Sequence, residues 1–197
     1  MPIVFSKKIS PAKKLAVWQI TESPDFFALR LGQPEGSITK KRQLENAVCS
    51  VLLDEMGGVG IHKQLVRDAL GKPYLEGSKT SVSFSHSRDM VACVLDVSGR
   101  PAGVDIEEQR DRIIEISKKF VNPSDTTPYM ETLHYHIVWG AKEVLYKLYA
   151  KKELDFICHL TVKFEKKFEG FIRKNDTNLR YTLDFEKINN FILVWNV

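Results

Sequence analysis

Apolar residues in the first half of the chain change from strand-like to helical spacing and back again. Between positions 37 and 56 they recur at the spacing of one helix face, and Gly57-Gly58 ends the pattern. Further on, polar and apolar residues alternate as they do in a half-buried strand. The predicted elements of this half are a strand at 15–20, helices at 37–56 and 62–70, and a hairpin of strands at 80–84 and 90–97 joined by a polar turn at 85–89.

The second half loosely repeats this order of helix and then antiparallel hairpin. The elements predicted for it are a strand at 103–107, helices at 113–120 and 132–151, and strands at 160–164, 168–172, 181–185 and 191–197. The turn Ser98-Gly99-Arg100-Pro101 is the natural boundary between the halves. We therefore expect an α+β fold with two similar lobes, 1–100 and 101–197, each a helix packed on an antiparallel sheet.

Composition excludes several classes of protein. Of the 197 residues, 43% are hydrophobic and 27% are charged, which is typical of a globular chain rather than a disordered or collagen-like one. The sequence contains no run of 18 apolar residues, which is the length that a membrane-spanning helix needs. The first residues lack the layout of a signal peptide. Three cysteines without a CxxC pair argue against a disulfide framework or a zinc site, so we expect a cytoplasmic protein.

The net charge of +4 is too small to indicate nucleic-acid binding. Its distribution is uneven, because the first 100 residues hold 14 Lys and Arg against 10 Asp and Glu, while the remainder holds 15 of each. An uneven solvated surface explains this excess, and the alternative is an anionic ligand held by the first half.

The first candidate for chemistry is the predicted strand Gly103-Val104-Asp105-Ile106-Glu107. Side chains alternate along a strand, so Asp105 and Glu107 share one face while Val104 and Ile106 share the other. Two carboxylates held this close repel each other unless a cation or a shared proton relieves them. The alternative is a sheet with one wet face, whose acids simply meet solvent.

The second candidate is the helical stretch from Trp139 to Lys147. Its buried stripe should be Ile137, Ala141, Val144, Leu145 and Leu148. Glu143 and Lys147 lie together on the opposite side near Trp139, where such a pair is ordinary helix support. A tryptophan on this polar side indicates that the face contacts another surface, such as the other lobe.

Two short turns complete the candidate set. His86 lies between two serines in the predicted hairpin turn and could donate hydrogen bonds to an anion, or it could be an idle surface residue. The turn Gly71-Lys72-Pro73 has the same ambiguity. Carboxylates from a strand and a helix, with Lys and His nearby, suit Mg²⁺ bridged to phosphates.

Taken in order, these four stretches resemble the 4′-phosphopantetheinyl transferase superfamily. Its pattern is a Gly-Lys-Pro turn, a Ser-His-Ser turn, a Gly-Val-Asp-Ile-Glu strand and a Trp-x-x-Lys-Glu-x-x-x-Lys helix, and here all four occur within about 77 residues. The length resembles the Sfp-like, two-lobed type, which implies a monomer with its active site at the lobe interface. The coenzyme A side would be the first lobe, and the metal-binding acids would belong to the second.

The resemblance implies transfer of 4′-phosphopantetheine from coenzyme A to a serine of an apo acyl or peptidyl carrier protein. The residues that match, with their implied roles, are Asp105, Glu107 and Glu143 as ligands of Mg²⁺ (or Mn²⁺), Glu143 and Lys147 as catalytic residues, and Arg42, Lys72, Pro73, Ser85, His86 and Lys147 as contacts of coenzyme A. The proton acceptor for the serine is Glu143 or a water held by the metal. No nucleic-acid or membrane partner is expected.

Two positions depart from the family pattern. Cys49 stands where family members often carry Arg, so one phosphate contact would be missing. Asp125 stands where a Glu is usual, and its shorter reach puts a secondary metal or base role in doubt. The alternatives to the transferase are a non-catalytic module that binds coenzyme A or a carrier protein, and a Mg²⁺-dependent pyrophosphate hydrolase.

Overall fold

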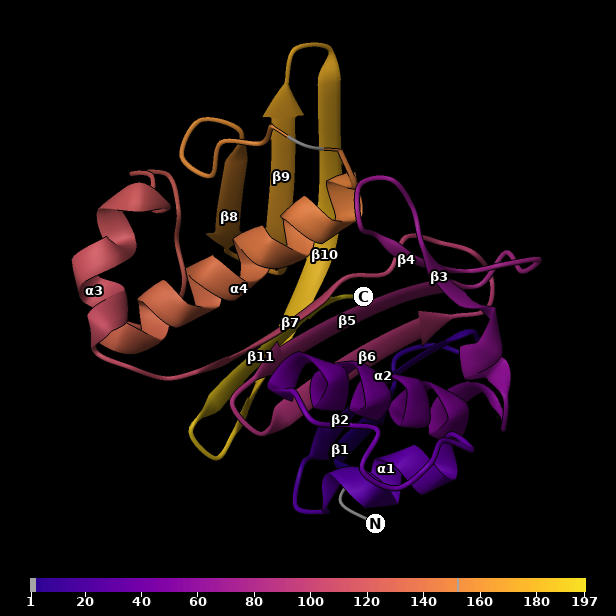
Figure 1. The fold of residues 1–197 in the computed structure, drawn as a ribbon. Coiled ribbons are helices and arrows are strands. Elements are labelled where there is room, and N and C mark those ends of the chain that lie inside the picture. Colours follow the sequence, from indigo (N-terminus) through magenta and orange to yellow (C-terminus); the bar gives the residue numbers. More distant parts are fainter. Residues whose placement is uncertain (1–2, 152) are drawn as a thin grey trace. The chain divides into compact units, whose positions relative to one another are not determined.

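The computed structural model describes residues 3–151 and 153–197, and it confirms the predicted α+β class. The chain divides into two compact units, Met1–Pro101 and Ala102–Val197. Each unit packs a long helix against an antiparallel sheet, as Figure 1 shows for α2 in the first unit and α4 in the second. The roles predicted for the two halves stay predictions.

The first unit is built on a four-stranded sheet with the strand order β1-β2-β6-β5. Helix α2 lies on this sheet, α1 packs against α2, and a small two-stranded sheet of β3 and β4 follows α2 in sequence. The elements are β1 (Ile3–Lys8), β2 (Lys13–Gln19), α1 (Pro24–Arg30), α2 (Lys41–Gly57), a 3-10 turn (Ile61–Gln64), β3 (Leu65–Arg67), β4 (Pro73–Leu75), β5 (Ser81–Ser87) and β6 (Met90–Asp96).

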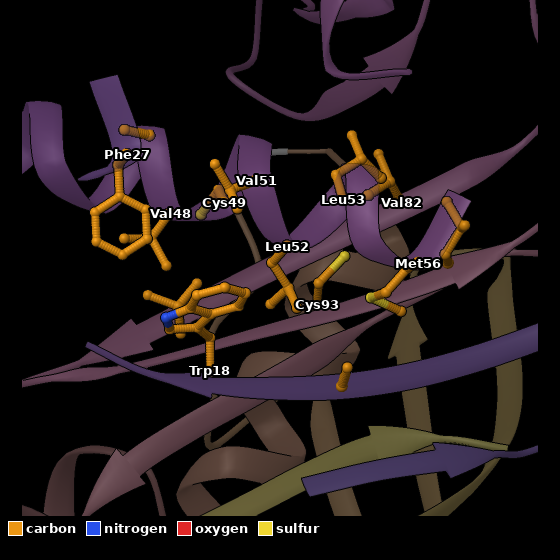
Figure 2. Packing of buried hydrophobic residues seen from close by; sticks show 14 of the residues in the cluster. Trp18, Phe27, Val48, Cys49, Val51, Leu52, Leu53, Met56, Val82 and Cys93 are labelled. Atoms are coloured by element: carbon orange, nitrogen blue, oxygen red, sulfur yellow. The ribbon is translucent and has the colours of Figure 1, made fainter. Parts of the chain in front are cut away.

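The core of the first unit forms where the apolar face of α2 meets the sheet (Figure 2). Trp18 from β2 and Phe27 from α1 are fully buried and meet edge to face, with ring centroids 5.9 Å apart. Cys49 and Cys93 belong to this core as free thiols. Burial raises the pKa of Cys49 to about 12, so this thiol is uncharged and apolar in character.

The second unit is built on a five-stranded sheet with the order β7-β11-β10-β9-β8. Helix α4 lies on one face of it, and the predicted stripe from Ile137 to Leu148 is buried there. The elements are β7 (Val104–Glu108), α3 (Arg112–Ile116), a 3-10 turn (Ser117–Lys119), α4 (Glu131–Tyr149), β8 (Leu160–Phe164), β9 (Phe168–Lys174), β10 (Thr177–Ile188) and β11 (Phe191–Asn196).

Two local predictions are wrong. The expected helix at 62–70 is a 3-10 turn followed by β3, because Leu65–Arg67 pairs with β4 and Asp68 then closes a turn by accepting the N–H groups of Leu70 and Lys72. The expected polar turn at 85–89 is shorter, because Ser85, His86 and Ser87 extend β5, where Ser87 pairs with Met90.

Three further elements, α1, β1 and β4, lie outside the prediction. Helix α1 begins with Ser23 as its N-cap and Pro24 in its first turn, which are ordinary start signals. Strand β1 pairs with β2 along its length. Among the helices in the described residues, none has both the length and the apolar character needed to cross a membrane.

Candidate functional site

Strand β7 presents its two acids toward helix α4. The register pairs Asp105 with Val194 and Glu107 with Ile192, and both of these partners belong to the core beneath α4. Val104 and Ile106 lie on the other face and are fully buried. Asp105 is only 5% exposed, so the alternative of a wet face does not hold for this carboxylate.

A glycine in α4 allows the helix to approach this part of the sheet. A Cβ atom at Gly140 would lie 2.7 Å from Val194 Cγ2, and the same atom would be 3.6 Å from Asp105 Oδ2. Any side chain at position 140 would therefore overlap Val194 and push the helix away from β11, while its Cβ would be in ordinary contact with the carboxylate. The sequence Trp-Gly-Ala-Lys-Glu thus places a backbone without a side chain directly over Asp105.

Lys147 connects α4 to β7. Its Nζ atom donates to Asp105 Oδ1 and to the carbonyl oxygen of Val104, each at 2.8 Å. The prediction treated Lys147 as a surface partner of Glu143 on the same helix. The lysine instead reaches the strand, because a four-carbon side chain can span the short gap that Gly140 leaves between α4 and β7.

Glu143 lies one turn before Lys147 and is half-buried. The pKa of its carboxyl is raised from 4.5 to about 7, first by burial and then by the negative charge of Asp105. Lys147 lowers the pKa of Glu143 in part, and Glu107 raises it further. The three predicted acids therefore act on one another electrostatically, as expected for carboxylates that share a site.

The three acids, Asp105, Glu107 and Glu143, have oxygen donors of the kind that a divalent cation needs. Within residues 3–151 and 153–197, no three His, Cys, Asp or Glu side chains are already gathered closely enough to hold a metal ion. The chemistry of the set nevertheless fits Mg²⁺, which takes oxygen ligands. It also fits electrostatically, because a cation would relieve the repulsion that raises the pKa of Glu143.

The phosphate contacts predicted in the first unit lie on α2, β4 and β5. His86 points away from the core between the buried residues Ser85 and Ser87, and its Nδ1 lies 3.5 Å from Glu45 Oε1 on α2. Arg42 is exposed on the same helix, three residues before Glu45. The ring nitrogens of a histidine at this exposed position can donate hydrogen bonds to phosphate oxygens.

Lys72 and Pro73 lie together at the turn between β3 and β4. Gly71 adopts a positive φ of 87°, and Pro73 is the first residue of β4. Lys72 is half-buried. Cys49, which the resemblance places where family members often carry Arg, is part of the core of the first unit.

Lys142 and Asp125 have structural positions that the sequence prediction missed. Lys142 has no exposed surface, and its Nζ lies 2.6 Å from Asp125 Oδ2, which is also fully buried. Asp125 is therefore part of a buried ion pair, a different place from the metal or base position considered for it. A signal was present in the sequence, because Lys142 falls four residues after Val138 and three before Leu145, on the buried side of the helix.

A cavity of about 210 Å³ lies in the second unit next to Glu107. Its walls combine charged and apolar groups and come from the end of β7, from α3 and from α4. The lining includes Glu107, Arg110, Arg112, Ile113, His136 and Trp139. Trp139, which lies on the polar side of the predicted helix, thus meets a cavity as well as its aromatic neighbours.

Comparison with known proteins gives one line of support for the family resemblance. No family model matches the chain. The chain is 30% identical over 84 residues to a curated 4′-phosphopantetheinyl transferase of Bacillus subtilis. The match spans 39% of this chain and 37% of that relative, so it covers little more than a third of each. This similarity supports the superfamily and the general class of enzyme.

Proposed function

We propose that the protein transfers 4′-phosphopantetheine from coenzyme A to a serine of an apo acyl or peptidyl carrier protein, as an Sfp-like enzyme that depends on Mg²⁺. The observation that carries the proposal is the raised pKa of Glu143 beside Asp105, with Lys147 bonded to the same aspartate. The partial similarity to a 4′-phosphopantetheinyl transferase supports the same reaction.

In the proposed reaction, the serine hydroxyl attacks the phosphorus that carries pantetheine, and a new P–O bond forms. The bond to the leaving phosphate breaks, and adenosine 3′,5′-bisphosphate departs with additional negative charge. Asp105, Glu107 and Glu143 would hold Mg²⁺, which supplies positive charge against the pyrophosphate when it is bound. Lys147 would add a second cation on the same side, since electrostatic stabilisation dominates reactions of this type.

Glu143 is the proposed proton acceptor for the serine. A general base works best when its pKa lies near the operating pH, and the pKa of Glu143 is about 7. Burial and the charge of Asp105 produce this value when no cation is bound. Mg²⁺ held by the same acids would lower the pKa, so that Glu143 would be ionised and able to accept the serine proton. Lys147 limits the rise and keeps part of the Glu143 population ionised at neutral pH.

The first unit would bind coenzyme A. His86, held beside Glu45, and Arg42 on the same helix would contact its phosphates. Lys72 and Pro73 would contact its nucleotide, together with the buried Ser85. This assignment gives the positive charge excess of the first hundred residues a ligand, because coenzyme A is strongly anionic. A cytoplasmic monomer completes the proposal.

The decisive experiment incubates the protein with coenzyme A, Mg²⁺ and several apo carrier proteins, and measures the carriers by intact mass spectrometry. A gain of one phosphopantetheine on a carrier is the expected result. Cleavage of coenzyme A without carrier labelling would favour the hydrolase, and binding without turnover would favour the non-catalytic module. Asp105→Asn is the matched negative control for the transfer assay, because it keeps the size of the side chain and removes the charge of a proposed Mg²⁺ ligand.

A further inference from the structure

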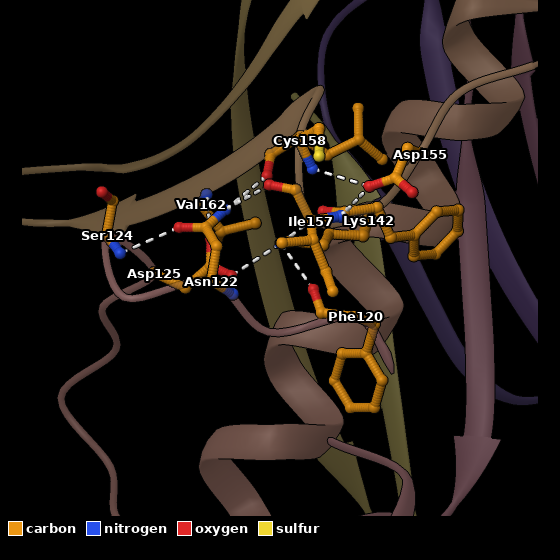
Figure 3. Close-up of polar contacts among 11 residues, drawn as sticks. Phe120, Asn122, Ser124, Asp125, Lys142, Asp155, Ile157, Cys158 and Val162 are labelled. Carbon is orange, nitrogen blue, oxygen red and sulfur yellow. Dashed lines mark hydrogen bonds and ion pairs between the residues drawn. The ribbon is translucent and has the colours of Figure 1, made fainter. Parts of the chain in front are cut away.

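We propose that Lys142 is a positioning residue whose buried ammonium fixes Trp139, and through it the wall of the cavity beside Glu107. The effect on turnover rests on the proposed function, whereas the effect on Trp139 does not. Lys142 is neighbour to Glu143 in sequence, yet its side chain leaves the helix toward two loops of the second unit (Figure 3).

The ammonium of Lys142 uses all three of its donor positions. It donates to the carbonyl oxygen of Phe120 at 2.7 Å and to that of Phe156 at 2.8 Å, and it pairs with Asp125 Oδ2 at 2.6 Å. A lysine carries three N–H donors and no acceptor, so this group is saturated although it has no contact with water. A single side chain therefore ties α4 to the loop after α3 and to the loop before β8.

Asp125 extends the connection to the backbone of the loop after α3 and of strand β8. Its Oδ2 also accepts the N–H of Asn122 at 2.9 Å, and its Oδ1 accepts the N–H of Val162 at 2.8 Å. The side-chain amide of Asn122 donates to the carbonyl of Leu160 at 2.8 Å. These hydrogen bonds join the loop after α3 to strand β8, and among them Lys142 is the link to α4 (Figure 3).

The two residues whose carbonyls bind Lys142 also hold Trp139. The ring of Phe120 meets the indole edge to face at 5.1 Å, and the ring of Phe156 meets it at 5.6 Å. In each phenylalanine the backbone carbonyl and the ring belong to the same residue. A hydrogen bond that fixes the backbone therefore restricts the positions open to the ring. Lys142 therefore fixes the partners of an indole that begins one helical turn earlier on its own helix.

Trp139 in turn forms part of the cavity that Glu107 and His136 also line. Lys142 itself does not belong to this lining, and it acts on the cavity only through the aromatic trio of Trp139, Phe120 and Phe156. The shape of the space next to a proposed metal ligand thus depends on a cation that touches none of the proposed reacting groups. This is positioning and not catalysis.

A buried ion pair is a poor device for stability alone. The cost of removing two charges from water usually equals or exceeds their attraction, and apolar replacement of both partners is often neutral or stabilising. Removal of one partner is costly, because it leaves the other charge buried and uncompensated. The Lys142–Asp125 pair therefore allows stability and positioning to be separated by comparing single and double variants.

The experiment compares Lys142→Met with Lys142→Met/Asp125→Asn, and uses Lys119→Met, an exposed lysine of the same unit, as control. The single variant should unfold more easily. The double variant leaves no uncompensated buried charge and should recover part of the lost stability. It should keep a loss of about tenfold in kcat/KM for the carrier, because small misplacements near a reacting centre are costly. Each background is also prepared with Trp139→Phe, so that subtraction isolates the fluorescence of Trp139 from that of Trp18 and Trp195.

The expected signature in the stable double variant is a shift in Trp139 emission together with the loss in kcat/KM. Unchanged Trp139 emission and a kcat/KM within twofold of wild type would overturn the proposal. If the wild-type protein labels no carrier, the proposed function fails instead, and the emission measurement still decides whether Lys142 positions Trp139.

Discussion

Replacing Glu143 by glutamine should make the protein more stable while it abolishes transfer. The pKa of Glu143 is raised from 4.5 to about 7 by burial and by the neighbouring acids. Between these two values the folded state binds more protons than the unfolded state, so the free energy of unfolding falls as the pH rises. Above pH 7 the wild type holds an ionised and partly desolvated carboxylate, which glutamine replaces by a neutral group of the same size.

The size of the effect follows from the same values. A pKa unit corresponds to about 1.4 kcal/mol, so the rise sets an upper limit of about 3 kcal/mol. Solvent screening at a half-buried side chain reduces this contribution to roughly 1–2 kcal/mol. A protein of this length gains about 2–4 °C in Tm for each kcal/mol. Glu143→Gln should therefore raise Tm by several degrees at pH 8 and leave it almost unchanged at pH 4.

The assay is thermal unfolding followed by circular dichroism at both pH values, with Glu115→Gln as the control for an exposed carboxylate of the same unit. Mg²⁺ should stabilise the wild type at pH 8, by about 2.7 kcal/mol at a hundredfold excess over Kd, and it should stabilise Glu143→Gln less. Equal stability changes at pH 4 and pH 8, or a loss of stability at pH 8, would refute the interpretation of Glu143 as a repelled carboxylate.

Three other variants test neighbouring parts of the site. Gly140→Ala should lower the free energy of unfolding in urea by about 1–3 kcal/mol, because its Cβ would overlap Val194 Cγ2; a neutral result would show that α4 can shift freely. Lys147→Met should cost about 1–3 kcal/mol by leaving buried Asp105 without this donor, and should lower kcat by about a hundredfold; wild-type turnover would remove it from the mechanism. His86→Ala should weaken coenzyme A binding in calorimetry by about tenfold, and an unchanged Kd would count against its phosphate role.

The long elements of the second unit could be predicted because their patterns are strong. The buried stripe of α4 and the strand from Leu160 to Phe164 were predicted from periodicity alone, and both are confirmed. The predicted helix at 62–70 is wrong, because Leu65 and Val66 pair with β4 instead. Short segments of this kind are decided by distant partners that local spacing does not contain.

The candidate site was predictable in its residue types but not in its contacts. Alternation along β7 correctly separated the acids from the buried pair Val104 and Ile106. The bond from Lys147 to Asp105 depends on how closely α4 approaches the strand, and that distance follows from tertiary packing at Gly140. The role of Lys142 was missed because periodicity treats a charged residue as exposed, whereas a partner from another loop allows it to be buried.

The close approach of α4 at Gly140 also has a kinetic consequence. With Val194 directly beneath the helix, the backbones that carry Asp105 and Glu143 cannot move apart or together without repacking the core. A cation reaching Asp105 would therefore need only the ammonium of Lys147 to rotate away. Rotamer changes of exposed side chains take picoseconds to nanoseconds, whereas rearrangement of packed elements takes microseconds or longer. Access of a cation to Asp105 should thus depend on the side chain of Lys147 and on dehydration of the ion, and not on a movement of α4 over β7.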